Sequence, residues 1–294
     1  MFTYSVYGIN LHAEMELPEL AGGEGTADAT VRFGKVDRLP AEAASQWQSW
    51  HATPTETCLF FQGIGAFLVR NGTDIVADPA ENAEPGVIRL AILGPALSML
   101  LHQRGLLVLH ASGVAVRERV IGFLGGSGWG KSTMAAALHT RGYPLVADDL
   151  VVIDFERGEV PLVMPGFPQL KLWPEAITSL GDSPEQLERL HPLMDKRARR
   201  AIDGFSPEPL PLHCLYVLED SDALGIDPLP RQQAFIELVG HSHDALLLEE
   251  TGASSEHFRQ CTRLVNATPI YRLNRPRDLA RLPDVVALIE QSLT

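Results

Sequence analysis

The sequence predicts an α/β protein whose main domain contains a mixed sheet and follows a smaller, β-rich N-terminal domain. Two observations lead to this prediction. Short β-prone runs with glycine-containing turns dominate the chain before residue 87, whereas buried apolar strands and a helix follow residue 105. We therefore predict a β-rich domain ending in a helix over residues 1–104 and a second domain over residues 105–294. The 294 residues are 45% hydrophobic, which is enough for cores of this size.

The N-terminal domain is predicted from strand-like runs and one clear turn. Residues 4–12 have strand character, and residues 31–33 could form a second strand. Residues 58–61 and 66–69 are short β-prone runs, and Asn71-Gly72 is a strong hairpin-turn signal before the next run. Together these segments make the first part of the chain β-rich.

A helix is predicted at the end of this domain. Apolar residues recur near helical spacing over residues 87–104. Gly105 suits the position just after a helix, because glycine readily adopts the left-handed conformation that ends one. Pro95 should lie near the start of the helix or at a kink, since proline lacks the N–H that a helix interior uses.

The second domain is predicted as strands around one glycine-rich loop and its helix. Residues 107–111 and 120–124 are apolar strands, and residues 113–116 continue or follow the first of them. Residues 132–140, rich in Ala and Leu, predict a helix. The remaining predicted elements are a buried strand over residues 145–147, surface helix and loop over residues 181–211, and a C-terminal helix over residues 279–293.

The charge of the chain limits its partners and its setting. Lys and Arg number 24 against 37 Asp and Glu, which gives a formal net charge of −13. This balance argues against a general nucleic-acid partner, because such a protein would call for a basic face. No apolar run reaches the roughly 18–20 residues that a membrane span needs, and the start lacks signal-peptide features. Cys58, Cys214 and Cys261 show neither a metal spacing nor a disulfide framework, so a cytoplasmic location is expected.

The strongest motif is a phosphate-binding loop, Gly-Gly-Ser-Gly-Trp-Gly-Lys-Ser. In such a loop, glycines let successive backbone N–H groups point at phosphate oxygens, and the following helix adds a favourable dipole. Lys131 would pair with the β- and γ-phosphates, and the Ser132 hydroxyl would bind Mg²⁺. The predicted nucleotide-binding residues are Gly125, Gly126, Ser127, Gly128, Trp129, Gly130, Lys131, Ser132 and Thr133.

Two carboxylates and a histidine accompany this loop. Asp148 and Asp149 follow a buried strand one helix after the loop, and adjacent strand residues point to opposite sides. One carboxylate can therefore hold Mg²⁺ while the other faces an incoming hydroxyl. His110 ends an apolar strand one hairpin before the loop, so its imidazole could exchange a proton with a carboxylate or contact the γ-phosphate.

These motifs together resemble the catalytic core of the HPr kinase family of bacterial serine kinases. That family places a Leu-His-(Ala/Gly) strand, a hairpin, a Gly-x-Ser-Gly-x-Gly-Lys-Ser loop, a helix and an Ala-Asp-Asp strand end in this order. The match covers residues 106–153. The resemblance implies an HPr kinase-like core that uses ATP, or another nucleoside triphosphate, and Mg²⁺. It implies an acid/base pair of His110 and Asp149, Mg²⁺ at Ser132 and Asp148, and phosphates at Lys131. Adjacency does not decide which aspartate is the base.

Other parts of the chain resemble a different branch of this family. The arginine- and glycine-rich signature of authentic HPr kinase/phosphorylases is absent after the acidic pair, and their N-terminal domain is not recognisable. The segments that instead resemble HPr kinase-related proteins of lasso peptide and peptide-modification gene sets are residues 60–61, 71–75, 101–105, 167–173 and 269–273. That resemblance implies a kinase acting on the C-terminal serine of a lasso peptide precursor.

Several further residues are candidates for the site. Lys171 and Trp173 follow a Pro-Gly turn and could line the cleft. A basic cluster is formed by Lys196, Arg197, Arg199 and Arg200. One of its arginines, such as Arg197, could reach the transferring phosphoryl group, or the cluster could dock an acidic peptide or form a solvated helix face. Arg272 lies in a β-like segment near the end of the chain. His241, His243 and Asp244 superficially suggest metal ligands, but no further partner stands at a known spacing.

Three functions follow from these residues. The leading one is an ATP- and Mg²⁺-dependent kinase that phosphorylates a serine hydroxyl of a peptide or small protein. The second keeps the fold but phosphorylates a small-molecule hydroxyl, or acts as an authentic HPr kinase/phosphorylase. The third is a regulatory nucleotide-binding module without catalysis, which the histidine and the acidic pair disfavour because binding alone needs no base. The sequence fixes neither the acceptor nor the oligomeric state, and a homo-oligomer is compatible with it.

Overall fold

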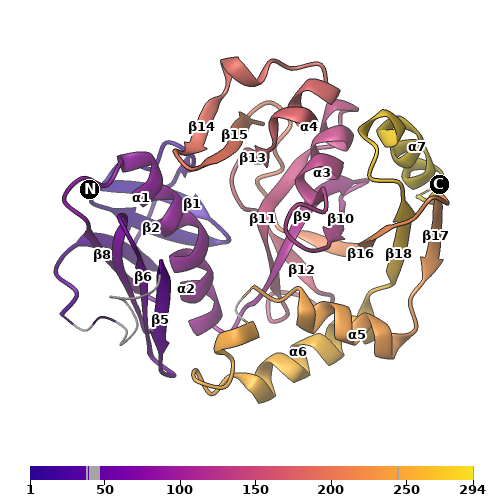
Figure 1. Cartoon of the computed structure of the whole chain (residues 1–294). Coiled ribbons are helices and arrows are strands. Elements are labelled where there is room, and N and C mark those ends of the chain that lie inside the picture. The colour runs from indigo at the N-terminus through magenta and orange to yellow at the C-terminus, as the bar shows by residue number, and fades with distance from the viewer. Residues whose placement is uncertain (38, 40–46, 244, 294) are drawn as a thin grey trace. The chain divides into compact units, whose positions relative to one another are not determined.

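The computed structural model describes residues 1–37, 39, 47–243 and 245–293 (Figure 1). The chain forms two compact units, one of residues 1–108 with 243–259 and the other of residues 109–242 with 260–294. The predicted boundary after residue 104 falls just before the end of the first segment. Residues 243–259 belong to the first unit, although the sequence assigned them to the second domain.

The first unit is built on one eight-stranded sheet, as its β-rich sequence predicts. Most neighbouring strands are antiparallel, but β4 runs parallel to both β2 and β8. The strand order is β3-β1-β2-β4-β8-β7-β6-β5. The strands are β1 (Phe2–Val6), β2 (Ile9–Ala13), β3 (Ala21–Gly22), β4 (Ala29–Phe33), β5 (Gln48–Ala52), β6 (Glu56–Phe61), β7 (Gly65–Arg70) and β8 (Asp74–Pro79).

Left-handed turn residues divide this sheet into hairpins. Asn71 and Gly72 have φ angles of 52° and 64°, which confirms the predicted turn between β7 and β8. The prediction of one strand over residues 4–12 is wrong, because Tyr7 (φ 51°) and Gly8 (φ 73°) form a turn there. The two halves of that segment are therefore the paired strands β1 and β2.

One long helical segment packs on this sheet. It consists of α1 (Pro85–Ala91), a π-helical turn (Ile92–Ala96) and α2 (Leu97–Gln103), and Gly105 follows with a φ of 77°. Pro95 lies inside the π-helical turn, where the i→i−4 pattern that proline would break is already replaced. By length and composition this 19-residue segment could cross a membrane, contrary to the expectation that no apolar run is long enough, and 67% of its most apolar window is buried.

The second unit contains a seven-stranded mixed sheet, which agrees with the predicted class. Its strand order is β10-β9-β11-β12-β16-β18-β17, and β10 also pairs in parallel with β16. The loop after β10 is therefore anchored between an antiparallel and a parallel neighbour. The strands are β9 (Leu107–Val116), β10 (Arg119–Leu124), β11 (Leu145–Asp154), β12 (Leu162–Met164), β16 (Leu210–Asp220), β17 (Gly225–Pro228) and β18 (Ile270–Arg275).

Helices α3 and α7 pack against this sheet and against each other (Figure 1). Their apolar side chains share one core with β10 and β16, which includes Phe123, Met134, Tyr216 and Val285. The predicted C-terminal helix is confirmed, because a short 3₁₀ turn (Leu279–Arg281) leads directly into α7. The helices are α3 (Lys131–Thr140), α4 (Pro174–Ser179), α5 (Arg231–Gly240), α6 (Ser254–Ala267), which carries residues of both units, and α7 (Leu282–Ser292).

The prediction of surface helix and loop over residues 181–211 is wrong. This segment instead forms β14 (Glu188–His191) and β15 (Met194–Arg200), which join β13 (Gln169–Leu172) in a three-stranded sheet. The sequence hides these strands because β15 is polar, while backbone hydrogen bonds hold it to both neighbours.

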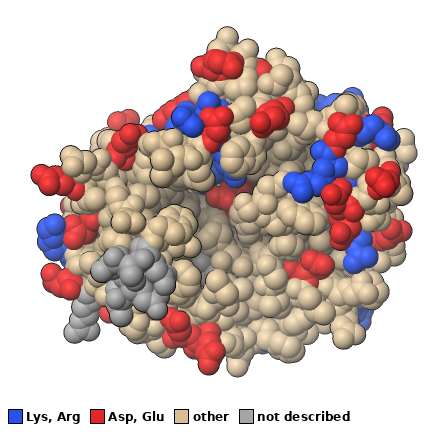
Figure 2. Space-filling model, viewed as in Figure 1, with Lys and Arg blue, Asp and Glu red and all other residues tan. Residues whose placement is uncertain are grey.

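On the face drawn in Figure 2, acidic and basic residues are interspersed rather than gathered by sign.

A row of stacked rings supports the strand that leads to the phosphate loop. The ring centroids of Phe123 and Tyr216 lie 5.9 Å apart, and those of Tyr216 and Tyr271 lie 5.7 Å apart. Phe123 and Tyr216 are buried. These rings therefore join β10, β16 and β18 beneath the loop.

We expect Phe123→Ala to lower the free energy of unfolding by about 3–5 kcal/mol, because it leaves a cavity in this row. Phe123→Leu keeps most of the volume and should cost less than about 1.5 kcal/mol. Urea unfolding followed by near-ultraviolet circular dichroism measures both. Equal losses in the two variants would contradict a packing role for the ring.

Candidate active site

The glycine-rich loop has the structural context that its motif requires. It follows β10, which ends at Leu124, and α3 begins at Lys131. Gly128 and Gly130 have φ angles of 78° and 88°, a region in which side chains with a Cβ are disfavoured. The predicted strand, loop and helix are thus confirmed, and the first N–H groups of α3 face the end of the loop.

Trp129 closes one side of the loop by packing on its glycines. A Cβ atom at position 126 would lie 2.9 Å from Cδ1 and 3.0 Å from Nε1 of the indole. Only glycine therefore fits at this position with the ring in place. The sequence named Trp129 as a loop residue, but the packing of its ring on Gly126 depends on the folded loop.

Lys131 is buried beneath the loop and bonds to it. Its Nζ donates hydrogen bonds to the carbonyl oxygens of Gly125 (2.7 Å) and Gly126 (3.0 Å). Burial lowers the pKa of Lys131 to about 8, although the negative charges of Asp149 and Asp148 oppose that shift. The net effect is a lower pKa, because the groups that bond directly to the ammonium are neutral carbonyls.

Asp149 is the centre of a charged cluster that three strands assemble. Its Oδ1 lies 3.2 Å from Nδ1 of His110 on β9, and its Oδ2 accepts a 2.7 Å hydrogen bond from Nζ of Lys171 on β13. Burial alone would raise the pKa of the Asp149 carboxyl, but Lys171 and then His110 hold it well below its usual value. The carboxylate is therefore ionised at neutral pH.

The backbone at Asp149 is strained. Its φ of 75° is left-handed, although it lies inside the ten-residue strand β11. The prediction that the acidic pair ends a strand is thus wrong, because β11 continues to Asp154. Left-handed non-glycine residues cost energy and persist where surrounding contacts hold them, often at functional sites.

Asp148 has a different environment from its neighbour. Only 3% of it is exposed. Its Oδ1 accepts a 2.5 Å hydrogen bond from the Ser112 hydroxyl, and its Oδ2 accepts a 2.8 Å bond from the backbone N–H of Lys171. Asp148 therefore fastens β11 to β9 and β13, while Asp149 faces the pocket.

A small pocket brings the predicted groups together. Its lining includes the loop as well as side chains from β9, β11, β13 and β15. Lys196 on β15 belongs to the basic cluster that the sequence noted, and it reaches this pocket from the strand that the sequence missed. The charged and hydroxyl-bearing lining residues are His110, Ser127, Lys131, Ser132, Thr133, Asp149, Lys171 and Lys196.

Six of the predicted site residues do not line this pocket: Gly125, Gly126, Trp129, Asp148, Arg197 and Arg272. Arg197 pairs with Asp195 at 2.8 Å and donates to the Pro184 carbonyl, so it serves the three-stranded sheet. Arg272 lies 3.8 Å from Glu219 on the neighbouring strand. Of the suggested metal ligands, His241 lies 3.4 Å from Glu237, and Asp244 lies outside the described residues.

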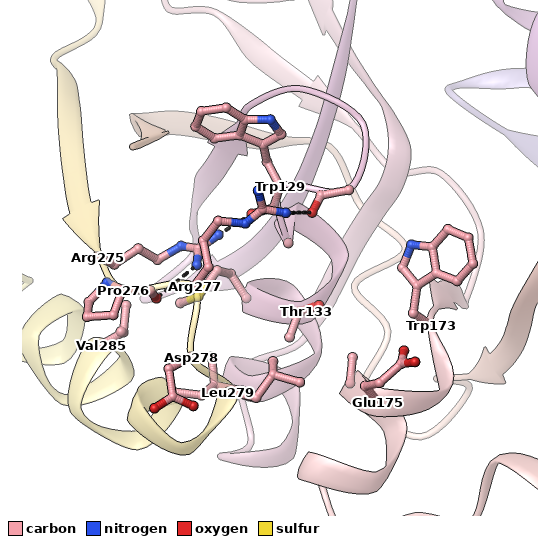
Figure 3. A pocket seen from close by; sticks show the side chains of 15 residues that line it. Trp129, Thr133, Trp173, Glu175, Arg275, Pro276, Arg277, Asp278, Leu279 and Val285 are labelled. Atoms are coloured by element: carbon pink, nitrogen blue, oxygen red, sulfur yellow. Dashed lines mark hydrogen bonds between the residues drawn. The ribbon is translucent and has the colours of Figure 1, made fainter. Parts of the chain in front are cut away.

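Sequence reasoning missed two arginines that hold the loop from the end of the chain. The Arg275 guanidinium donates to the carbonyl oxygen of Trp129 and is largely buried, and Arg277 donates to the Gly128 carbonyl at 3.0 Å (Figure 3). The signal available was an Arg-Pro-Arg run that begins at the last residue of the last strand. Two adjacent loop carbonyls thus have cationic donors from a segment almost 150 residues away.

The residues of the pocket fit a magnesium ion in part. Mg²⁺ in phosphate-loop sites is held by one or two protein oxygens together with phosphates and waters. Ser132 and Asp149 present such oxygens to the pocket, whereas the Asp148 oxygens already accept hydrogen bonds. Among the described residues, no group of three or more His, Cys, Asp or Glu side chains could hold a metal by itself.

Comparison with known proteins includes a distant structural likeness. No family model and no curated protein matches the sequence. Among solved structures, the HPr(Ser) kinase/phosphatase from Coxiella burnetii is similar, with a TM-score of 0.37 and 10% sequence identity, covering 63% of this chain and 90% of that chain. This likeness is too distant to assign a function, which has to come from the side chains of the site.

Glycine and alanine at position 149 separate the backbone strain from the lost carboxylate, because both remove the same ion pairs. Glycine usually costs about 0.5–1 kcal/mol relative to alanine. At a φ of 75° the left-handed conformation costs alanine about 1–2 kcal/mol. We therefore expect Asp149→Gly to be more stable than Asp149→Ala in urea unfolding. At Val152 on the same strand the order should reverse, and the same order at both positions would contradict the strain.

The lowered pKa of Lys131 predicts a pH dependence of nucleotide binding. Above a pH of about 8 the free protein loses the ammonium that pairs with phosphate, so binding must take up a proton. With EDTA present to exclude divalent cations, the Kd for ATP should rise by up to roughly tenfold per pH unit between that point and pH ~9.5. Titration calorimetry measures this slope. Lys131→Arg stays charged throughout and should remove it; a slope that persists in this variant rules out Lys131 as its source.

Proposed function

We propose that this chain is a phosphotransferase that moves the γ-phosphoryl group of ATP, or another nucleoside triphosphate, to a hydroxyl group. The observation that carries this proposal is the meeting of Asp149 with His110 and Lys171 in the same pocket as Lys131 and Ser132. A module that only bound nucleotide could use an ionised carboxylate for Mg²⁺, but it would not need a strained backbone that turns this carboxylate to His110 and Lys171.

The proposed chemistry assigns phosphate binding to Lys131 and proton removal to Asp149. The loop N–H groups and Lys131 bind the phosphates, and a bound Mg²⁺ would neutralise part of their charge. The acceptor oxygen forms a bond to the γ-phosphorus while the bond to the β–γ bridging oxygen breaks, so ADP leaves. Asp149 accepts the hydroxyl proton. Because Lys171 and His110 keep its pKa low, this carboxylate takes the proton as the new bond forms rather than beforehand.

The positioning roles differ between the two aspartates. We assign Mg²⁺ to Ser132 and phosphate oxygens, with Asp149 as the nearest carboxylate. Asp148 was the sequence-based Mg²⁺ candidate, but its buried oxygens accept bonds from Ser112 and Lys171. We therefore propose that Asp148 sets the position of Asp149. His110 orients the carboxylate through its Nδ1.

The acceptor we propose is a serine hydroxyl of a peptide or small protein. Lys196 lines the pocket from β15, and the phosphate loop does not require its charge. An ammonium at this place would suit an acceptor that carries a carboxylate next to its hydroxyl, such as the C-terminal serine of a lasso peptide precursor. Free serine would satisfy the same charge, so the two acceptors have to be compared directly.

Substitutions at Asp149 and Lys131 separate transfer from binding. Lys131→Ala should abolish both ATP binding and transfer, since it removes the buried cation at the phosphates. Asp149→Asn should retain ATP binding and lower transfer by about 10²- to 10⁴-fold, the usual contribution of a general base. The assay follows γ-labelled ATP with peptides ending in serine, small proteins and free serine as acceptors.

Asp222→Asn is the matched control, because it makes the same chemical change in an exposed loop residue outside the pocket. It should leave both binding and transfer unchanged. Near-normal transfer by Asp149→Asn would show that the base is assigned wrongly. Tight binding of ATP that stays intact with every acceptor would favour the regulatory nucleotide-binding module instead.

A further inference from the structure

A second cavity adjoins the phosphate pocket at the start of α3. Its volume is about 190 Å³, and its lining comes from the loop, α3, α4 and the segment that follows β18 (Figure 3). Gly128, Gly130, Thr133 and Trp173 line both this cavity and the phosphate pocket. The two spaces therefore adjoin each other at the loop and the first turn of α3.

The residues that line each space indicate which end of a nucleotide it would hold. His110, Asp149 and Lys171 line only the phosphate pocket, whereas Glu175, Arg277 and Asp278 line only the second cavity. If the γ-phosphate of a nucleotide lies at Asp149, its other phosphates would lie along Lys131 and Ser132. Beyond Thr133, the neighbouring space in the second unit is this cavity.

We propose that this cavity binds the nucleoside of the donor nucleotide, with the base stacked on Arg277. This inference rests on the phosphotransferase function proposed above. Its volume of about 190 Å³ is below the roughly 300–1,000 Å³ of pockets that enclose a whole drug-sized ligand. The space suits a ring system and its sugar, while the phosphates occupy the adjoining pocket.

Arg277 is held in an orientation suited to stacking. Its guanidinium carbon lies 5.8 Å from the centroid of the Trp129 ring, and its Nη2 donates to the Gly128 carbonyl. Trp129 itself rests on Gly126, so the indole, the guanidinium and the loop form one supported stack. Guanidinium groups stack on planar rings, and a fixed one loses little freedom when a base is added.

The cavity also has a second ring, that of Trp173, and two carboxylates, those of Glu175 and Asp278. Figure 3 shows Trp173 and Glu175 across the cavity from Trp129 and Arg277. Trp173 is 42% exposed, and Asp278 uses Oδ1 to accept a bond from the Ala280 N–H. Carboxylates at this end suit the hydroxyl and amino donors of a nucleoside and would repel its phosphates. The charge pattern therefore agrees with the direction set by the catalytic residues.

The test compares ATP with inorganic tripolyphosphate, which has the phosphates but no nucleoside. Both are titrated calorimetrically with Mg²⁺ at neutral pH into the wild-type protein, Trp173→Ala and Arg277→Ala. We expect the wild type to bind ATP at least tenfold more tightly. Each variant should weaken ATP binding by roughly tenfold, as expected for loss of one stacking or cationic contact. Trp173 also lines the phosphate pocket, and its ring centroid lies 5.7 Å from Nζ of Lys196. The decisive quantity for Trp173→Ala is therefore the ratio of the ATP affinity to the tripolyphosphate affinity, which should fall.

Arg231→Ala is the control for loss of an exposed arginine, since Arg231 lies at the start of α5 outside both spaces. It should change neither affinity, and retained tripolyphosphate binding shows that each variant is folded. Equal wild-type affinity for the two ligands would overturn the nucleoside site and leave the phosphotransferase proposal standing. An ATP affinity that is unchanged in both cavity variants would also overturn the nucleoside site without affecting the phosphotransferase proposal. If the wild type bound neither ligand, both proposals would fall.

Discussion

The adjacent carboxylates of Asp148 and Asp149 are the constraint on which the site depends. In a regular strand they would point to opposite faces and could not both serve one site from a fixed backbone. The left-handed conformation of Asp149 changes the direction of the chain at that residue. Asp148 then ties β11 to Ser112 and to the backbone of Lys171, while Asp149 turns to His110 and to the Lys171 side chain. Asp148 thus binds the backbone N–H of Lys171, and Asp149 binds its side-chain ammonium.

Burial acts on both charged groups at the centre of the pocket, and their partners decide the result. Burial disfavours the ionised form of Lys131 and of Asp149 alike. Lys131 bonds to neutral carbonyls, so burial dominates and its pKa falls. Asp149 bonds to a lysine and a histidine, so their attraction dominates and its pKa also falls. The pocket therefore keeps a carboxylate charged beside a lysine whose charge is easily lost, and bound phosphate would restore the latter.

The sequence predicted the parts of the site that depend on neighbours in the chain. The strand–loop–helix around Lys131, the nearby strand carrying His110 and the acidic pair follow one another within about 45 residues. Lys171 was proposed, but its contact with Asp149 depends on β13 packing beside β11. Lys196 reaches the pocket on β15, whose polar sequence conceals a strand held by backbone hydrogen bonds. Pairing of this kind leaves no hydrophobic period to detect.

The loop also depends on residues that its motif does not contain. Arg275 and Arg277 bond to the carbonyls of Trp129 and Gly128, which turn away from the phosphate side when the N–H groups face it. Their charges lie behind the loop and add to its attraction for anions without entering the phosphate pocket. The position of these arginines is set by β18, which pairs with β16, which in turn pairs with the loop strand β10. The sheet thus brings the end of the chain to the loop, and the geometry of the phosphate site is a property of the whole second unit.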